Sequence, residues 1–235
     1  MIISGFDKLS ILNYPGEVAC TIFTNGCNFK CPYCQNSGLV LGTDHTRYEE
    51  DQILAYLKKR KGLIDGICIS GGEPTIQKGL KEFIQKVKKL KVKVKLDTNG
   101  SHPEVLEDLL KENLLDYVAM DIKTSLKKYE EVTNAKAPLS KIKKSIQLLQ
   151  ESSIAYEFRT TVIKQYHTIK DIEEIAELTK GSPYYLQKFV DSDTCIEQGL
   201  ASYTDQELIQ IYQQVLQKYP NIKLRGIDIE SKRSE

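Results

Sequence analysis

Long apolar runs and a secretory signal are both missing from this sequence of 235 residues. A transmembrane helix needs about 18 or more consecutive apolar residues, and no such stretch occurs, so we expect no membrane span. The N-terminus, MIISGFDKLS, lacks the charged segment followed by an apolar segment that marks a secreted chain. These two absences predict a cytoplasmic protein.

An excess of either charge is also missing. The chain carries 33 Lys and Arg residues against 32 Asp and Glu residues, which gives a net charge of +1. This balance gives no electrostatic reason to expect nucleic acid as a partner. Two basic runs, Lys58–Lys61 and Lys88–Lys95, are interpreted as solvated faces, with a docking surface for an acidic partner as the alternative.

A disulfide scaffold is not expected, because the six cysteines occur in a chain predicted to be cytosolic. Cys20 and Cys68 lie in apolar runs and are predicted to be small core residues. Cys195 lies in a polar segment, where it could be an exposed thiol, and it has no neighbour that marks it as reactive. The other three cysteines are close together in sequence and need a separate explanation.

Short apolar runs alternate with amphipathic segments along the chain. Continuous apolar runs are typical of strands that are buried on both faces. The predicted strands are Glu17–Thr24, Gly66–Ser70, Val92–Thr98, Asp116–Ile122, Ala155–Ile163, Tyr184–Val190 and Ile222–Arg225. The predicted helices are Tyr48–Lys61, Ile76–Leu90, Pro103–Asn113, Ser140–Ser152, Thr168–Thr179 and Thr204–Tyr219.

This alternation predicts an α/β fold whose parallel strands are joined by right-handed crossovers. About six repeats are too few for a closed eight-stranded barrel, so a partial (β/α)6 barrel of the TIM type, or a doubly wound sheet, fits better. In both folds the functional site lies at the C-terminal ends of the strands. We expect a single domain over residues 1–235, with a core at about 16–190, a C-terminal helix and strand at 204–228, and a frayed tail.

The segment GCNFKCPYCQN places Cys27, Cys31 and Cys34 in one loop after the first predicted strand. Structural zinc sites and cubane iron–sulfur clusters normally take four protein ligands, and no fourth cysteine lies nearby. An open coordination position is useful in a catalytic site because substrate or cofactor can fill it. Three cysteines therefore favour a catalytic cluster, and a zinc site completed by His45 is the alternative.

The same loop resembles the signature of the radical S-adenosylmethionine superfamily, CxxxCxΦC, in which Φ is an aromatic residue and here is Tyr33. The resemblance implies a [4Fe-4S] cluster on Cys27, Cys31 and Cys34, with S-adenosylmethionine chelating the open iron through its amino and carboxylate groups. In such enzymes the reduced cluster cleaves the cofactor, and a 5′-deoxyadenosyl radical abstracts a hydrogen atom. The protein supplies orientation and excludes water.

The segment SGGEP follows the second predicted strand, and two glycines let a ligand approach the backbone closely. A turn is the alternative interpretation of this segment. In the superfamily the GGEP motif holds the methionine amino group of the cofactor. The resemblance therefore implies that Gly71, Gly72 and Glu73 bind the cofactor.

The segments LDTNG and MDIK follow the third and fourth predicted strands. Taken singly, Asp97 or Asp121 could cap a helix. Together the segments resemble the DTNG and DxK segments of glycyl-radical-enzyme activating enzymes. This resemblance implies that Asp97, Thr98, Asp121 and Lys123 lie by the methionine carboxylate and sugar of the cofactor, and that the aspartates help to hold a monovalent cation.

Two residues of later strands complete the predicted pocket. A charged residue in an apolar strand is unusual unless it is paired, so Arg159 could pair with a core carboxylate. The resemblance implies instead that Arg159 contacts the carboxylate or ribose of the cofactor. Gln187, in the segment YYLQKFV, is placed to reach the adenine or ribose.

The N-terminal passage GFDKLSILNYPGEVACTIFTNGCNFKCPYCQNSGLV resembles the activating proteins of anaerobic ribonucleoside-triphosphate reductase, in the longer form related to pyruvate formate-lyase activating enzyme. The similarity runs from Gly5 to about Val190. It implies a glycyl radical enzyme as protein substrate and an electron donor of the flavodoxin or ferredoxin type. The alternatives are a small-molecule radical enzyme, such as a 7-carboxy-7-deazaguanine synthase, and a non-catalytic metal-binding module with four protein ligands.

Overall fold

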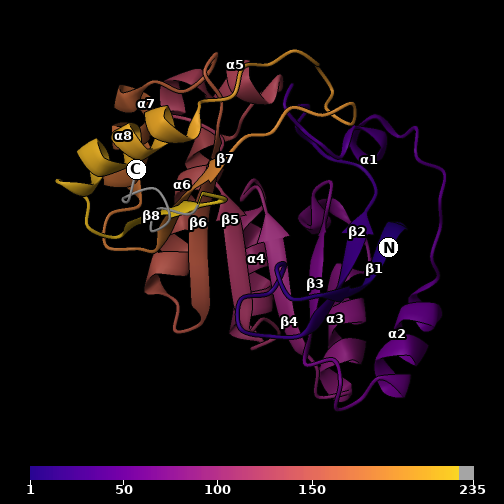
Figure 1. The fold of residues 1–235 in the computed structure, drawn as a ribbon. Coiled ribbons are helices and arrows are strands. Elements are labelled where there is room, and N and C mark those ends of the chain that lie inside the picture. Colours follow the sequence, from indigo (N-terminus) through magenta and orange to yellow (C-terminus); the bar gives the residue numbers. More distant parts are fainter. Residues whose placement is uncertain (228–235) are drawn as a thin grey trace.

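The computed structural model describes residues 1–227, which form one eight-stranded sheet in the order β1-β2-β3-β4-β5-β6-β7-β8 (Figure 1). β1 is antiparallel to β2, and every later pair is parallel. The strands are β1 (Ile3–Ser10), β2 (Ala19–Thr24), β3 (Gly66–Gly71), β4 (Lys93–Thr98), β5 (Tyr117–Asp121), β6 (Ala155–Val162), β7 (Tyr184–Lys188) and β8 (Ile222–Arg225).

Helices connect the parallel strands and cover one face of the sheet (Figure 1). Two of them begin with capping boxes at Thr168 and Thr204. In each box the Thr side chain accepts a hydrogen bond from the backbone N–H three residues later, and the carboxylate of that later residue accepts one from the backbone N–H of the Thr. The longer helices are α2 (Glu50–Lys59), α3 (Leu80–Lys89), α4 (Pro103–Lys111), α6 (Leu139–Glu151), α7 (Ile169–Leu178) and α8 (Asp205–Leu216). Short helical turns are α1 (Ser37–Leu41), α5 (Tyr129–Thr133), Pro74–Ile76 and Leu126–Lys128.

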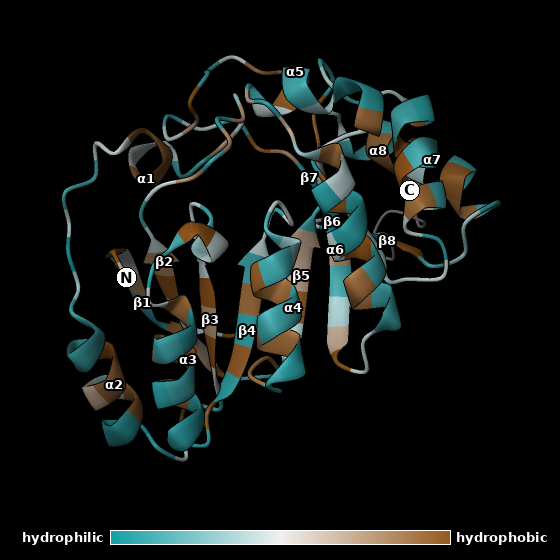
Figure 2. Cartoon of the chain, turned by 180° about the vertical axis from the view of Figure 1, so that it is seen from behind, coloured by the Kyte–Doolittle hydropathy of each residue, from teal (hydrophilic) through white to brown (hydrophobic). Residues whose placement is uncertain are grey.

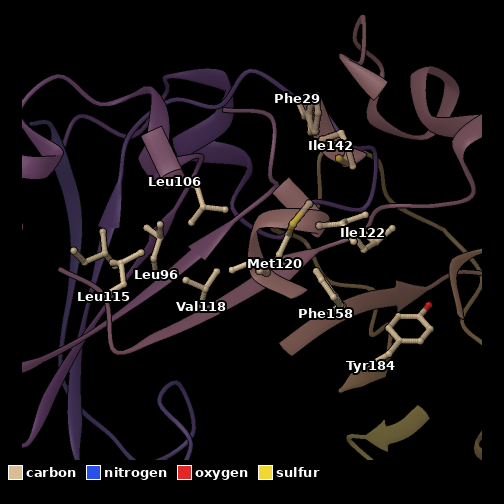
Figure 3. Close-up of a cluster of buried hydrophobic side chains, with 14 of the residues drawn as sticks. Phe29, Leu96, Leu106, Leu115, Val118, Met120, Ile122, Ile142, Phe158 and Tyr184 are labelled. Carbon is tan, nitrogen blue, oxygen red and sulfur yellow. The ribbon is translucent and has the colours of Figure 1, made fainter. Parts of the chain in front are cut away.

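The apolar core lies between the sheet and these helices. Figure 2 shows the hydrophobic sides of the helices turned toward the sheet and the hydrophilic sides turned outward. Leu96 of β4 and Met120 of β5 pack with Leu106 of α4 and Ile142 of α6, all nearly fully buried (Figure 3). Because successive strand residues point to opposite faces, the residues that alternate with these core positions face the interior of the barrel.

The partial barrel predicted from the sequence is confirmed. The strand order follows the chain order without a reversal, whereas a doubly wound sheet reverses at a switch point. β1 and β8 are the two ends of the sheet and do not pair with each other within residues 1–227. The barrel is therefore open along one side.

The predicted strands and helices all occur, with ends that differ by a few residues. The antiparallel strand β1 and the short helices α1 and α5 were not predicted. Residue 228 and the predicted frayed tail lie outside the described residues, and the limits of the domain stay predictions. In the part of the chain that the structure describes, no helix combines the length and the apolar character needed to span a membrane.

Two predictions about exposure are wrong. Cys195 is only 5% exposed, because its segment packs against the loop that carries the three clustered cysteines. Lys95 belongs to the second basic run but is only 2% exposed, because it points into the barrel. Lys58–Lys61 is exposed at the end of α2, and Cys20 and Cys68 are buried, as predicted.

Candidate active site

A pocket opens at the C-terminal ends of the parallel strands, where the functional site was expected. Its volume is about 330 Å³, which is within the usual range for a small-molecule site. Every residue that the resemblance assigns to the cluster or the cofactor lines this pocket, and the roles assigned to these residues stay predictions. They are Cys27, Cys31, Tyr33, Cys34, Gly71, Gly72, Glu73, Asp97, Thr98, Asp121, Lys123, Arg159 and Gln187.

The three clustered cysteines lie in the loop between β2 and α1, and all three are free thiols. The backbone N–H of Cys34 donates to the carbonyl oxygen of Cys31 at 3.0 Å, and the N–H of Phe29 donates to Sγ of Cys27 at 3.4 Å. Burial raises the pKa of Cys27 to about 12 and that of Cys31 to about 11. Both thiols are therefore protonated at neutral pH, and a metal must displace the proton to bind them.

A segment far along the chain supports the cysteine loop. The backbone N–H of Ile196 donates to the carbonyl oxygen of Cys34 at 3.2 Å, and the N–H of Glu197 donates to that of Pro32 at 2.8 Å. Cys195 precedes both donors and is buried against the same loop. Sequence reasoning missed this support, because its composition is that of an ordinary polar loop.

Gly71 and Gly72 let the loop after β3 touch the start of the cysteine loop. The N–H of Gly72 donates to the carbonyl oxygen of Thr24, and the N–H of Glu73 donates to that of Gly26, both at 2.9 Å. A Cβ on Gly72 would lie 1.9 Å from the Gly26 carbonyl oxygen. A Cβ on Gly71, whose φ is +120°, would lie 2.2 Å from the backbone nitrogen of Thr24. Only glycines permit this contact.

Glu73 joins the loops after β3 and β4. The residue is 1% exposed, and its carboxylate accepts hydrogen bonds from the backbone and hydroxyl of Thr75, from Thr98 Oγ1 at 2.8 Å and from the Asn99 N–H at 2.7 Å. Burial raises the pKa of this carboxyl above its usual value, while the hydrogen bonds oppose the shift. Glu73 therefore shapes the wall of the pocket, and its contact with a methionine amino group stays a prediction.

Asp97 and Asp121 end neighbouring strands and are joined by Arg159. Nε of Arg159 donates to Oδ1 of Asp121 at 2.8 Å, and its NH2 group lies 3.6 Å from Oδ2 of Asp97. Lys123 pairs with Asp121 at 3.0 Å, and Lys95 pairs with Asp97. Burial alone would raise the pKa of each aspartate, but these cations outweigh it and hold both pKa values below the usual range. Arg159 thus pairs with carboxylates and also lines the pocket.

Two asparagines connect the pocket loops and were not predicted. Nδ2 of Asn36 donates to the carbonyl oxygen of Gly71 at 3.1 Å. Nδ2 of Asn99 donates to Oδ1 of Asn28 at 3.0 Å and lies 3.9 Å from Sγ of Cys27. Asn36 is the last residue of the segment GCNFKCPYCQN and Asn99 lies within LDTNG, and these positions are the signal that could have found them.

Tyr33 lines the pocket, and its buried hydroxyl group has no hydrogen-bond partner within residues 1–227. A buried polar atom of this kind needs an explanation, and a ligand that contacts the pocket wall supplies one. Tyr33 lies within the cysteine loop, so such a ligand would sit beside the three thiols. The Tyr33 side chain therefore fits a pocket built around a bound cofactor.

The donor set fits an iron–sulfur cluster better than a zinc ion. No group of three or more His, Cys, Asp or Glu side chains in residues 1–227 is arranged to hold one metal ion. His45, the alternative zinc ligand, is exposed and does not line the pocket. A cubane cluster binds each cysteine through a different iron atom, so its three ligands need not converge on one point. The three thiols at the pocket therefore suit a cluster with one open iron.

Fold and site together define a partial barrel with a pocket at its strand ends, and three cysteines line this pocket. The family model of the Radical SAM superfamily matches residues 21–179, which is the greater part of the chain. The chain belongs to the radical SAM superfamily and is an enzyme. Members of this superfamily bind a [4Fe-4S] cluster and S-adenosylmethionine.

Relatives with several different names are similar to this chain. It is 38% identical over 204 residues to "Putative glycyl-radical enzyme activating enzyme MJ1227" of Methanocaldococcus jannaschii, covering 84% of this chain and 83% of that protein. It is 37% identical over 111 residues to "Probable GTP 3',8-cyclase" of Pyrococcus horikoshii, covering 47% of this chain and 36% of that protein. It is 27% identical over 183 residues to "7-carboxy-7-deazaguanine synthase" of Thermococcus kodakarensis, covering 69% of this chain and 70% of that protein.

The fold is also similar to solved structures. The crystal structure of Streptococcus suis SuiB bound to precursor peptide SuiA matches with a TM-score of 0.71 at 16% identity. The match covers 91% of this chain and 50% of the SuiB chain. At this identity the similarity supports the fold alone.

Proposed function

We propose that this chain is an activating enzyme for a glycyl radical enzyme. It abstracts a hydrogen atom from the Cα of one backbone glycine in a partner protein, and anaerobic ribonucleotide reductase is the expected partner. The observation that carries the proposal is the meeting of LDTNG and MDIK around Arg159, at the pocket that also contains the three cysteines. The 38% identity to the relative named as an activating enzyme supports the same assignment.

The reduced cluster, when bound, would supply the one electron that cleaves S-adenosylmethionine into methionine and a 5′-deoxyadenosyl radical. Cys27, Cys31 and Cys34 would hold the cluster. The chain would orient the nucleoside and shield it from water, which is the usual contribution of a protein to cofactor chemistry. The residues that would hold S-adenosylmethionine are Tyr33, Gly71, Gly72, Glu73, Asp97, Thr98, Asp121, Lys123, Arg159 and Gln187.

A protein substrate must bring a backbone glycine into the barrel. The sheet does not close between β1 and β8 in the described residues, and in this proposal the partner loop enters on that side. A bound partner loop would also cover the pocket and help to exclude water. In this proposal the electron comes from a flavodoxin or ferredoxin-type protein of the cytoplasm.

A radical reaction on a small molecule is the second candidate. The similarity to the deazaguanine synthase of Thermococcus kodakarensis, over 69% of this chain, favours it. Such an enzyme would use the same cluster and the same cofactor. The two candidates differ in substrate, because only the activating enzyme needs a partner protein.

The activating function can be tested by electron paramagnetic resonance under anaerobic conditions. Cluster-loaded protein that is reduced and mixed with S-adenosylmethionine and an anaerobic ribonucleotide reductase should give a glycyl radical signal and 5′-deoxyadenosine. Cys31→Ala should lose both products and the brown absorbance of the cluster, because two thiolates cannot hold a full cubane. Cys20→Ala is the matched control, since Cys20 is a buried thiol that does not line the pocket.

The outcomes test the activating function separately from membership of the radical SAM superfamily. Formation of 5′-deoxyadenosine without a glycyl radical on any candidate partner would overturn the activating function. A Cys31→Ala protein that keeps a full cubane and still cleaves the cofactor would contradict the ligand assignment.

A further inference from the structure

Lys95 is a buried lysine that neither the core nor the predicted pocket accounts for. It lies on β4 two residues before Asp97, so both side chains point to the same face of the strand. Its side chain is 2% exposed, and its Nζ contacts Oδ1 of Asp97. The same Nζ lies 3.7 Å from Sγ of Cys68 and 5.9 Å from the ring centre of Tyr117. Asp97 is thus its single carboxylate partner among the described residues.

Protein donors contact all four oxygens of the two pocket aspartates. Lys95 contacts Oδ1 of Asp97, and Ser70 Oγ donates to Oδ2 of Asp97 at 3.0 Å. Arg159 donates to Oδ1 of Asp121 at 2.8 Å, and Lys123 contacts Oδ2 of Asp121 at 3.0 Å. A metal ion that bound these carboxylates would have to displace or share these donors.

The charges at this end of the pocket already favour an anion. Two carboxylates face three fixed cations, Lys95, Lys123 and Arg159. The nearby carboxylate of Glu157 does not change this balance, because Arg225 binds it through two hydrogen bonds of 2.8 Å. An added monovalent metal ion would lie within a few ångströms of the three cations, and their repulsion is strong in a buried site.

The monovalent cation that the resemblance implies does not fit these residues. We propose that the ammonium group of Lys95 takes its place: Lys95 neutralises Asp97 from inside the barrel, so that Arg159 and Lys123 can receive the carboxylate of S-adenosylmethionine without a bound Na⁺ or K⁺. Lys95 is a positioning residue, since it does not line the pocket and acts through Asp97. The inference rests on the cofactor pocket of the proposed function and is independent of the partner protein.

The first measurement uses the wild-type protein. The affinity of the cluster-loaded protein for S-adenosylmethionine is measured anaerobically by equilibrium dialysis, in NaCl, KCl or tetramethylammonium chloride at equal ionic strength. We expect dissociation constants that agree within about twofold in the three salts. An affinity at least tenfold weaker in tetramethylammonium chloride would overturn the proposal.

The second measurement uses Lys95→Met, which keeps an unbranched side chain and removes the charge. In tetramethylammonium chloride we expect at least a tenfold loss of affinity, which NaCl or KCl restores in part. Lys93→Met, on the same strand but exposed, should bind as the wild type does in all three salts. Circular dichroism of each variant checks that it is folded.

A folded Lys95→Met protein that binds as tightly as the wild type would overturn the proposal. So would weak binding that neither metal ion improves. If Lys95→Met does not fold, the salt comparison on the wild type decides alone. Because binding is measured without a partner protein, failure of the activating function would leave these results unchanged.

Discussion

Gly72 is the point at which the cysteine loop and the loop after β3 approach most closely. The Gly26 carbonyl oxygen would lie 1.9 Å from a Cβ at this position, and the other nearest atoms are also backbone atoms, of Gly26 and Cys27. The two loops carry the predicted cluster ligands and the GGEP motif, so their contact determines the shape of the pocket.

Gly72→Ala should push these two loops apart. We expect the free energy of unfolding of the metal-free protein to fall by about 1–3 kcal/mol, as for other overpacked sites. We also expect less iron bound per chain after reconstitution, because the loop with Cys27 must shift. Urea unfolding and iron analysis measure the two effects. Gly38→Ala is the matched control: its Cβ would lie 3.4 Å from Asp44 in ordinary contact, so little should change. Equal stability of the two variants would contradict this account.

At the scale of helices and strands, the sequence predicted best the strands that are buried along their length. The parallel strands were predictable because they are covered on both faces and therefore read as apolar runs. β1 was missed because it is an edge strand with a mixture of buried and exposed residues, ISGFDKLS. α1 and α5 have five residues each, which is too short for a helical period to be visible in the sequence.

The pocket was predictable to the extent that it is built from contiguous motifs. Residues that support the pocket without lining it were not, because their role depends on tertiary packing alone. Lys95 is an example: KVKVK reads as a solvated charge pattern, and only the curvature of the sheet around a polar interior buries Lys95. The support from Ile196 and Glu197 is another, since more than 160 residues separate it from the cysteine loop.

His167, which lies just before α7, joins the segments that follow β5 and β6. It is fully buried, and its Nδ1 accepts a hydrogen bond of 3.1 Å from the backbone N–H of Ile163, which follows β6. Its Nε2 therefore carries the proton and donates it at 2.8 Å to the carbonyl oxygen of Lys123, which follows β5. Burial lowers the pKa of His167, although Asp171 at the start of α7 opposes the shift and Lys128 supports it. The folded protein thus prefers the neutral imidazole that makes both hydrogen bonds.

His167 should make stability depend on pH below about 6.5, the usual pKa of histidine. Since the folded-state pKa is the lower one, the unfolded chain binds protons first as the pH falls, and the free energy of unfolding decreases by up to about 1.4 kcal/mol per pH unit. His167→Gln cannot titrate, so its loss between pH 7.5 and 5.0 should be smaller than that of the wild type. Urea unfolding at the two pH values measures it. His45→Gln, at an exposed site, should lose as much free energy of unfolding over this pH range as the wild type. An equally large loss in His167→Gln would contradict the role of His167 in the pH dependence.

At the scale of the whole molecule, the pocket gathers side chains and loops from strands that are far apart in the chain. Its lining runs from Cys27 after β2 to Val190 after β7. The sheet does not close on itself within residues 1–227, so hydrogen bonds between strands do not hold the ends of the barrel together. A ligand that contacts both sides of the pocket would add to the loop hydrogen bonds by which Ile196 and Glu197 join them.

Loading with the cluster and S-adenosylmethionine should therefore raise the thermal stability of the entire domain. A ligand that binds only the folded state at about 100 times its Kd adds about 2.7 kcal/mol. For a chain of this size that corresponds to a rise in Tm of about 5–10 °C. Anaerobic melting curves of metal-free, cluster-loaded and doubly loaded protein measure the rise, and exposure to air should reverse it as the cluster is lost. Cys31→Ala treated in the same way should show no rise. If the fully loaded protein has the same Tm as the metal-free protein, the cluster and the cofactor do not join the two sides of this pocket.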